Sequence, residues 1–174
     1  FYRTFWKAQE LTTDEAVVAW GDPGLPDFHN MNWSAANLFL HGVYYKSMYG
    51  ITIVNEFLRQ STPEKVASRG ITGAEAETIN KYIPEVRFLR AYQYWVLMDL
   101  FGNPPFVTES SVIGGPNPPQ IQRDSLYGYI VSELLAIENE LPAAKTNEYG
   151  RADKGAAQAL LARVYLNAEV YTGT

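Results

Sequence analysis

The segment from Trp20 to Asn37 (WGDPGLPDFHNMNWSAAN) mixes aromatic rings with short polar side chains. Sugar binding needs this combination, because ring faces stack on the apolar C–H face of a pyranose while carboxylates and amides bond to its hydroxyls. Irregular segments held by a rigid scaffold are also common positions for binding residues. We therefore predict a ligand site here, with these candidate contacts: Trp33, Asn37, Asn30, Asp27, Trp20 and Asp22. The alternative interpretation is that Trp20 and Trp33 only anchor the segment to the helices.

Catalytic chemistry finds little support in the sequence. Glycoside hydrolysis needs two carboxyl groups that converge on one bond. Asp22 and Asp27 share the candidate segment, but nothing in their spacing places them on either side of a sugar. Three further acids have the spacing of a solvated helix face: Glu133, Glu138 and Glu140. We expect a binding protein with no catalytic residue.

Metal binding is also weakly supported. His29 and His41 lack an HExxH pattern or any other ligand spacing, and the chain has no cysteine. Oxygen atoms of Asp22, Asp27 and Asn30 are conceivable calcium ligands, but the 12-residue loop pattern of a calcium site is missing. We expect no metal and no cofactor.

The bulk composition limits the classes of partner. The net charge is −5, and no run of Lys or Arg is present, which argues against nucleic acid. No apolar stretch approaches the roughly 18 residues of a membrane span. The chain begins at Phe1 without Met or a leader pattern, so we interpret it as a piece of a longer protein.

Two long segments have helical periodicity. Apolar residues recur at steps of three and four from Asn37 to about Leu58, which is typical of a helix. The second segment runs from Ala74 to Phe101, and Pro84 inside it predicts a kink or a break near Ile83. Its second half is apolar nearly all round, as in a helix buried between others.

The rest of the chain predicts shorter helices. Residues 110–120 form a loop by composition, and Asp124 or Ser125 is expected to cap a helix that Pro142 ends. A last helix is predicted from Asp153 to about Tyr171. No two alternating segments pair convincingly as strands. The expected fold class is therefore all-α, with antiparallel helix pairs of tetratricopeptide-like type and long irregular loops.

Three motifs resemble one known family. Residues 86–109 (VRFLRAYQYWVLMDLFGNPPFVTE) and 149–167 (YGRADKGAAQALLARVYLN) are similar to two runs of SusD/RagB-type proteins, and residues 11–18 (LTTDEAVV) are similar to the start of the family pattern. Asn103 departs from the acid that is common there. In the RFLRAY helix, Arg87, Arg90 and Tyr92 most simply tie neighbouring helices together, with the guanidinium groups on carbonyls or carboxylates.

The resemblance implies an outer-membrane, surface-exposed lipoprotein that captures oligosaccharides for a SusC-like TonB-dependent transporter. It implies that Trp33 is one member of an aromatic platform, and that the lipid anchor lies outside this chain. Residues 1–174 would be the amino-terminal part of one SusD-like helical domain, truncated at both ends. Two alternatives stay open from the residues alone: a helical-repeat scaffold for another protein, and a hydrolase.

Overall fold

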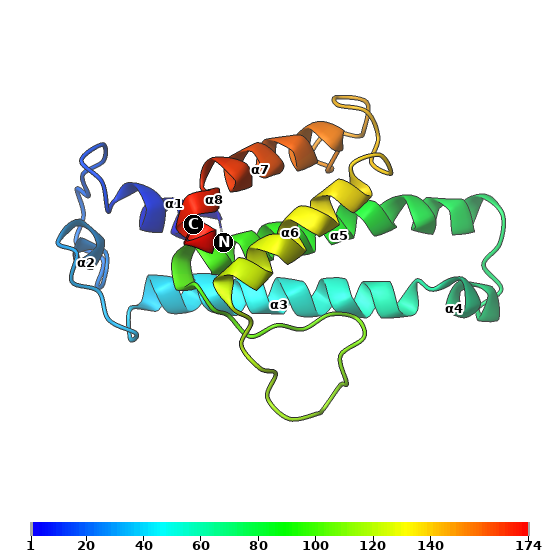
Figure 1. The fold of residues 1–174 in the computed structure, drawn as a ribbon, viewed down its shortest axis with the longest axis horizontal. Helices are drawn as coiled ribbons and strands as arrows, with labels where there is room; N and C mark the ends of the chain where they lie inside the picture. The colour runs from blue at the N-terminus through cyan, green and yellow to red at the C-terminus, as the bar shows by residue number, and fades with distance from the viewer. Residues whose placement is uncertain (1, 174) are drawn as a thin grey trace. The chain divides into compact units, whose positions relative to one another are not determined.

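The computed structural model describes residues 2–173, and helices are the only regular elements in that range (Figure 1). One isolated bridge pairs Pro105 with Gln120. The predicted all-α class is confirmed. The helices are α1 (Tyr2–Glu10), α2 (Pro26–His29), α3 (Leu38–Gln60), α4 (Pro63–Ser68), α5 (Ala74–Phe101), α6 (Arg123–Ile137), α7 (Lys154–Leu166) and α8 (Ala168–Thr172).

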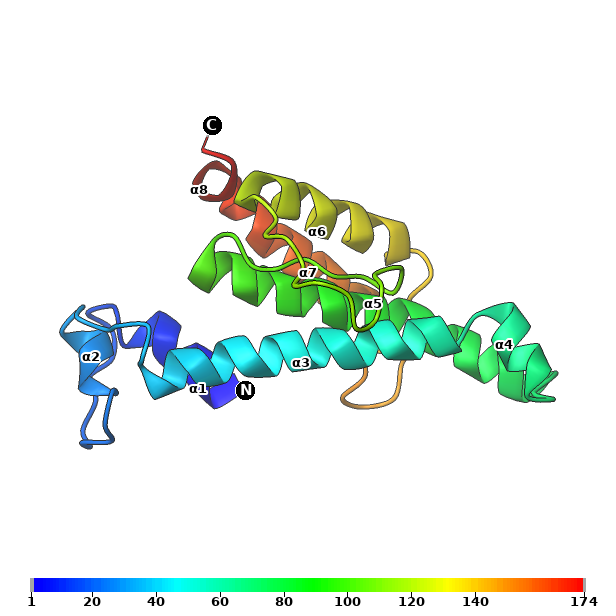
Figure 2. The same cartoon turned by 90° about the horizontal axis from the view of Figure 1, so that it is seen from below.

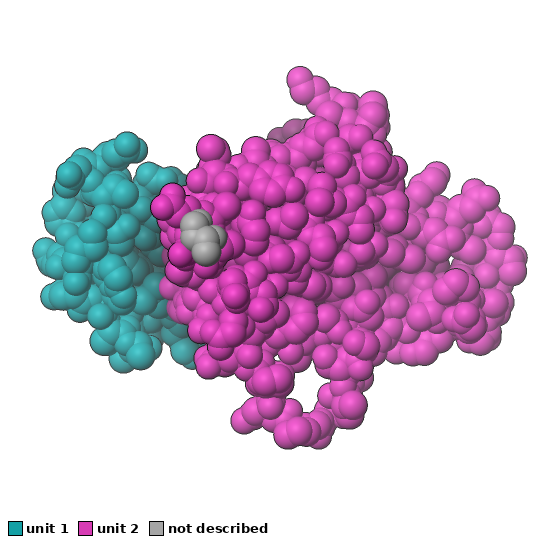
Figure 3. Space-filling view, in the orientation of Figure 1, with its two compact units in different colours: residues 1–49 teal, residues 50–174 magenta. Residues whose placement is uncertain are grey.

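The chain divides into two compact units, and the boundary falls inside α3, between Tyr49 and Gly50 (Figure 3). The first unit contains α1, α2 and the beginning of α3. The second contains the end of α3 and all later helices. That residues 1–174 belong to one domain of a larger protein stays a prediction.

The second unit is built around α5. Helices α5, α6 and α7 alternate in direction, with α6 along α5 and with α7 and α8 against α6 (Figures 1 and 2). The predicted stripe on α6 forms the centre of this core, since Leu126, Ile130, Leu134 and Ile137 are fully buried. The second half of α5 is buried as its apolar composition predicts, with Tyr94 to Met98 almost without exposed surface.

Helix α5 has the predicted limits but is not broken. It runs without interruption from Ala74 to Phe101, so of the expected kink or break near Ile83 the break is wrong. Pro84 removes one backbone hydrogen bond, which costs up to roughly 3 kcal/mol, yet its ring is buried. Burial of the ring and packing along the rest of this 28-residue helix offset that cost.

Two helix starts differ in how well the sequence predicts them. Asp153, the predicted beginning of the last helix, caps α7, because its Oδ1 accepts from the N–H of Ala156 at 2.9 Å. The expected cap of α6 by Asp124 or Ser125 is wrong, because the helix already begins at Arg123. The amide oxygen of Asn103 accepts from the Arg123 N–H at 2.8 Å, so a residue at the end of α5 fastens the start of α6.

The arginines of the RFLRAY helix join α5 to its neighbours. Arg87 makes a two-pronged contact with the Glu133 carboxylate on α6, at 2.9 and 3.1 Å. Arg90 is buried and donates to Glu133 at 3.3 Å, to the Asn55 amide oxygen on α3 at 2.8 Å, and to the Glu109 carboxylate. A buried charge needs such partners, so this network fixes the helix positions.

The loop after α5 is tied back to the helices. The Tyr94 hydroxyl donates to the Val107 carbonyl at 2.6 Å and accepts from the Val107 N–H at 2.8 Å. Asn55 donates to the same carbonyl at 3.2 Å, and Arg59 donates to the Glu109 carbonyl at 2.8 Å. Burial raises the pKa of Tyr94 to about 12. The loop therefore leaves the helices at a fixed place before it projects from the second unit (Figures 1 and 3).

Candidate functional site

Asn37 organises the predicted ligand segment, all of which lies in the first unit. Its amide oxygen accepts from the N–H groups of Phe39 and Leu40 at 3.0 and 3.3 Å, as the residue before a helix does. Its amide nitrogen donates to the Gly24 carbonyl at 2.7 Å and to the Asp27 carboxylate at 3.1 Å. Both groups of this buried side chain are thus used to hold the segment against the start of α3.

Gly24 is required for that contact. Its φ is +84°, a left-handed conformation that glycine adopts without strain. A Cβ atom at this position would lie only 2.9 Å from the Asn37 amide nitrogen. A larger residue at position 24 would therefore push Asn37 away from the loop.

Four aromatic side chains and one lysine form a cluster, and three of the rings come from the segment itself. Phe28 is buried, and its ring lies 6.2 Å from both Trp33 and Phe39. The ammonium group of Lys7, on α1, lies 4.7 Å from the Phe39 ring centre and 5.7 Å from that of Trp20. These distances are within the range of cation–π attraction. Lys7 thus joins Trp20 to Phe39, and Phe28 joins Phe39 to Trp33. One cluster therefore connects the two tryptophans.

Both tryptophans also present open surface. Trp33 is 44% exposed and Trp20 is 54% exposed, although each has a ring or cation packed against it. A large apolar ring that is fixed on one side and open on another is suited to stacking on a sugar ring.

The tip of the segment is held in an uncommon backbone conformation. Met31 has a φ of +53°, which non-glycine residues rarely adopt, and its side chain is exposed. The Asn32 N–H donates to the Asp27 carbonyl at 3.0 Å and closes the turn. Asn30 and Asn32 precede Trp33 in the chain, and both are exposed. Their amides can donate to and accept from sugar hydroxyls.

The six predicted contacts fall into two groups. Trp20, Trp33, Asp22 and Asn30 are exposed and can meet a ligand directly. Asn37 is buried, and Asp27 is half-buried and bonded to it, so these two support the segment. The aromatic cluster links the two tryptophans to each other. Asp22 and Asn30 are exposed on the same segment.

Lys7 and Phe39 belong to the cluster but are missing from the sequence prediction. Lys7 lies in the run FYRTFWKAQE, where nothing in the sequence indicates that a lysine will be almost completely buried. Phe39 follows Asn37 at the start of a long helix and looks like one more core residue. A hydrophobic residue two positions after the cap was the available signal for Phe39.

Over the described range, no group of three or more His, Asp or Glu side chains is placed so that it could hold a metal ion. None of the helices found between residues 2 and 173 is long and apolar enough to cross a membrane. Arg87 and Arg90 bond to protein groups in the second unit, and Tyr92 packs its ring 5.5 Å from Trp95.

Comparisons with a family model and with a known relative point to the same family. Residues 27–166 match the SusD-like family model described as "Starch-binding associating with outer membrane". The chain is 40% identical to the starch-binding protein SusD of Bacteroides thetaiotaomicron over 174 residues, which is 99% of this chain and 29% of that protein. The chain thus spans less than a third of the length of this relative.

Solved structures of the family have the same fold. A SusD-like carbohydrate-binding protein of Bacteroides fragilis is 28% identical, with a TM-score of 0.67 over 86% of this chain and 28% of that one. Surface glycan-binding protein A of Bacteroides uniformis is 23% identical, with a TM-score of 0.76 over 96% of this chain and 37% of that one. The predicted tetratricopeptide-like helix arrangement is confirmed by such neighbours. The chain belongs to the SusD-like family of carbohydrate-binding proteins.

Proposed function

We propose that this chain is part of a cell-surface protein that binds oligosaccharides without cleaving them. The observation that carries the proposal is the pair of half-exposed tryptophans, Trp20 and Trp33, held by one aromatic cluster on a family fold for carbohydrate binding. Exposed rings supply stacking surface, and the neighbouring Asp and Asn side chains supply hydrogen bonds to hydroxyls.

Binding rests on stacking and hydrogen bonds alone in this proposal. No cleavage step is assigned to Asp22 and Asp27, and the carboxylate of Asp27 accepts from the Asn37 amide in a supporting role. Each hydrogen bond to a sugar hydroxyl replaces one to water, so its net contribution is only about 1 kcal/mol. Affinity for a short oligosaccharide is therefore modest, and the aromatic rings provide most of it.

The first ligands to test are starch-like glucans, because the 40% identical relative is named a starch-binding protein. A glycan array probed with the intact protein measures this directly. We expect retention on a subset of glucose polymers and no release of reducing sugar from them. Release of reducing ends would favour a hydrolase, and an array without any signal would contradict the proposal.

The proposal includes delivery of the glycan to a SusC-like TonB-dependent transporter, with the protein attached to the outer membrane by a lipid anchor outside this chain. The family description of outer-membrane association supports this location. Affinity purification from solubilised outer membranes should recover the transporter with the tagged protein. Recovery of the tagged protein in the soluble fraction, without a transporter, would contradict this part.

A further inference from the structure

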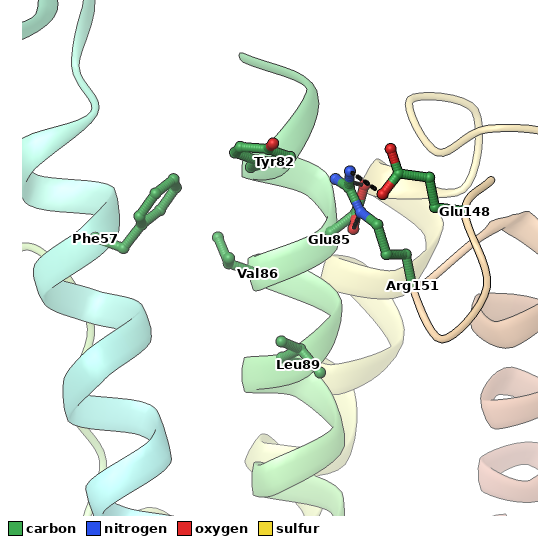
Figure 4. A pocket seen from close by; sticks show the side chains of 7 residues that line it. All are labelled: Phe57, Tyr82, Glu85, Val86, Leu89, Glu148 and Arg151. Atoms are coloured by element: carbon green, nitrogen blue, oxygen red, sulfur yellow. Dashed lines mark hydrogen bonds and ion pairs between the residues drawn. The ribbon is translucent and has the colours of Figure 1, made fainter. Parts of the chain in front are cut away.

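A hollow of about 430 Å³ lies in the second unit (Figure 4). It is bordered by Phe57 of α3, by the first half of α5, and by the loop before α7. Its volume is in the range of about 300–1,000 Å³ that is typical of small-molecule sites. It is shallow and largely open to solvent.

One side of the hollow is apolar and aromatic. Phe57 points from α3 toward α5, and Tyr82 and Val86 point from α5 toward α3 (Figure 4). Leu89 extends this surface by one turn and is nearly half exposed. Two rings that border an open space offer stacking surface for a ligand with an apolar face.

The opposite side is a polar wall that is rigid before any ligand arrives. Arg151 makes a two-pronged contact with the buried Glu85 carboxylate, at 2.6 and 3.0 Å. Asn147 donates to the same carboxylate at 3.2 Å. The Arg151 guanidinium also lies 4.5 Å from the Tyr82 ring centre. These contacts fix the positions of both the arginine and the tyrosine ring.

Two polar groups remain available at the rim. The Arg151 contacts with Glu85 use Nε and Nη2, while Nη1 has only a 3.8 Å approach to the Glu148 carboxylate. The Glu148 side chain is 81% exposed. The rim therefore places one hydrogen-bond donor and one acceptor next to the two rings.

This pattern fits a sugar better than an ion. Neighbouring hydroxyls of a pyranose can accept from Nη1 and donate to the Glu148 carboxylate, while the C–H face of the sugar stacks on the rings. An anion would meet the Glu148 charge, and the Arg151 charge is already paired with Glu85. A metal cation would find only one open carboxylate.

We propose that this hollow is a second saccharide-binding site, which takes one sugar unit of an oligosaccharide between Phe57 and Tyr82. The proposal rests on the proposed glycan-binding function but uses residues distinct from the Trp20 to Asn37 segment. Binding there involves no covalent reaction and no partner protein. Its affinity is low, because a single unit is bound at an open hollow.

The test uses the intact protein with Trp33→Ala, so that binding at the first site is weakened about tenfold. Saturation-transfer NMR with maltoheptaose then measures the binding that remains. We expect Tyr82→Ala in this background to weaken the residual affinity at least fivefold. Tyr165→Ala is the matched control, because Tyr165 is half exposed on α7, and it should change nothing.

Glu148→Ala is a second test variant that should fold normally, because the Glu148 side chain is exposed and supports no buried contact. It should weaken the residual affinity two- to fivefold. If neither Tyr82→Ala nor Glu148→Ala changes the residual binding, or if Trp33→Ala alone abolishes all binding, the second site is refuted and the proposed function stands. If the unsubstituted protein binds no glycan, both proposals fail. A crystal of the intact protein with a polypeptide segment in the hollow would also refute the second site.

Discussion

Arg90 ties three parts of the second unit together, so its loss should lower stability strongly. It is buried, and it bonds to groups from α3, α6 and the loop after α5. Arg90→Met removes the charge and leaves Glu133 with one fewer partner in a partly buried position. Because breaking a buried ion pair typically costs about 3–5 kcal/mol, we expect a loss of that order in urea unfolding.

The matched control for this prediction is Arg3→Met. Arg3 lies on α1 and is exposed, so its replacement should change the free energy of unfolding by less than roughly 0.5 kcal/mol. Equal effects of the two substitutions would contradict the structural role assigned to Arg90.

Glu109 makes stability depend on acid pH. Burial raises the pKa of its carboxyl group, but the hydrogen bond and charge of Arg90 outweigh this, so the pKa lies below the usual 4.5. A lowered folded-state pKa means that the contribution is fully present above about pH 4.5 and is lost as the pH falls through the lower value. The difference in unfolding free energy between the unsubstituted chain and Glu109→Gln should therefore shrink from pH 7 to pH 3. A gap that stays constant or grows on acidification would show that the carboxylate is not stabilised by Arg90.

At the scale of residues, the sequence predicts which types could bind a sugar but not which of them are free to do so. Asn37 is as polar as Asn30 in the sequence, yet only the structure shows that its amide is consumed by the helix start and by Gly24. The burial of Lys7 under Trp20 is likewise a consequence of tertiary packing. Local composition contains no information about either contact.

At the scale of elements, Asn37 connects the ligand segment to α3. Asn37→Ala removes both the cap and the bond to the Gly24 carbonyl, and should cost roughly 2–3 kcal/mol in urea unfolding. Asn37→Asp keeps an oxygen for the cap but places a carboxylate beside the Gly24 carbonyl and Asp27. We expect it to be destabilised by a similar amount and to bind glycan less well.

Asn37→Ser separates the two roles, because serine caps helices but cannot reach the Gly24 carbonyl as a long amide does. It should recover part of the stability and little of the glycan binding. Full recovery of both by serine would mean that the tie to Gly24 is unimportant.

The helices were predictable to different degrees for physical reasons. The limits of α5 follow from its long apolar pattern and from Gly102, which ends it with a positive φ that glycine adopts without strain. The continuity of α5 through Pro84 depends on packing that the local penalty of proline does not include. The start of α6 at Arg123 depends on a bond from Asn103, twenty residues earlier, which no local capping rule contains.

At the scale of the whole molecule, the motifs of residues 86–109 have a clear structural meaning. Arg90 and Tyr94 of this run hold Glu109 and Val107 of the following loop, so the run has a structural role in this fold. The ligand segment lies outside that run and is ordered by its own cluster. Recognition of the family from these motifs therefore says little about which glycan is bound.

Binding of a glycan by Trp33 and its cluster can be measured with an affinity gel of the intact protein. Trp6 provides the matched control, since it is 47% exposed on α1 and Trp33 is 44% exposed. In a gel that contains a starch-type polysaccharide, we expect Trp33→Ala to raise the dissociation constant about tenfold, which is about 1.4 kcal/mol, with Trp6→Ala unchanged. Unchanged retention of Trp33→Ala, with the fold intact by circular dichroism, would contradict the account.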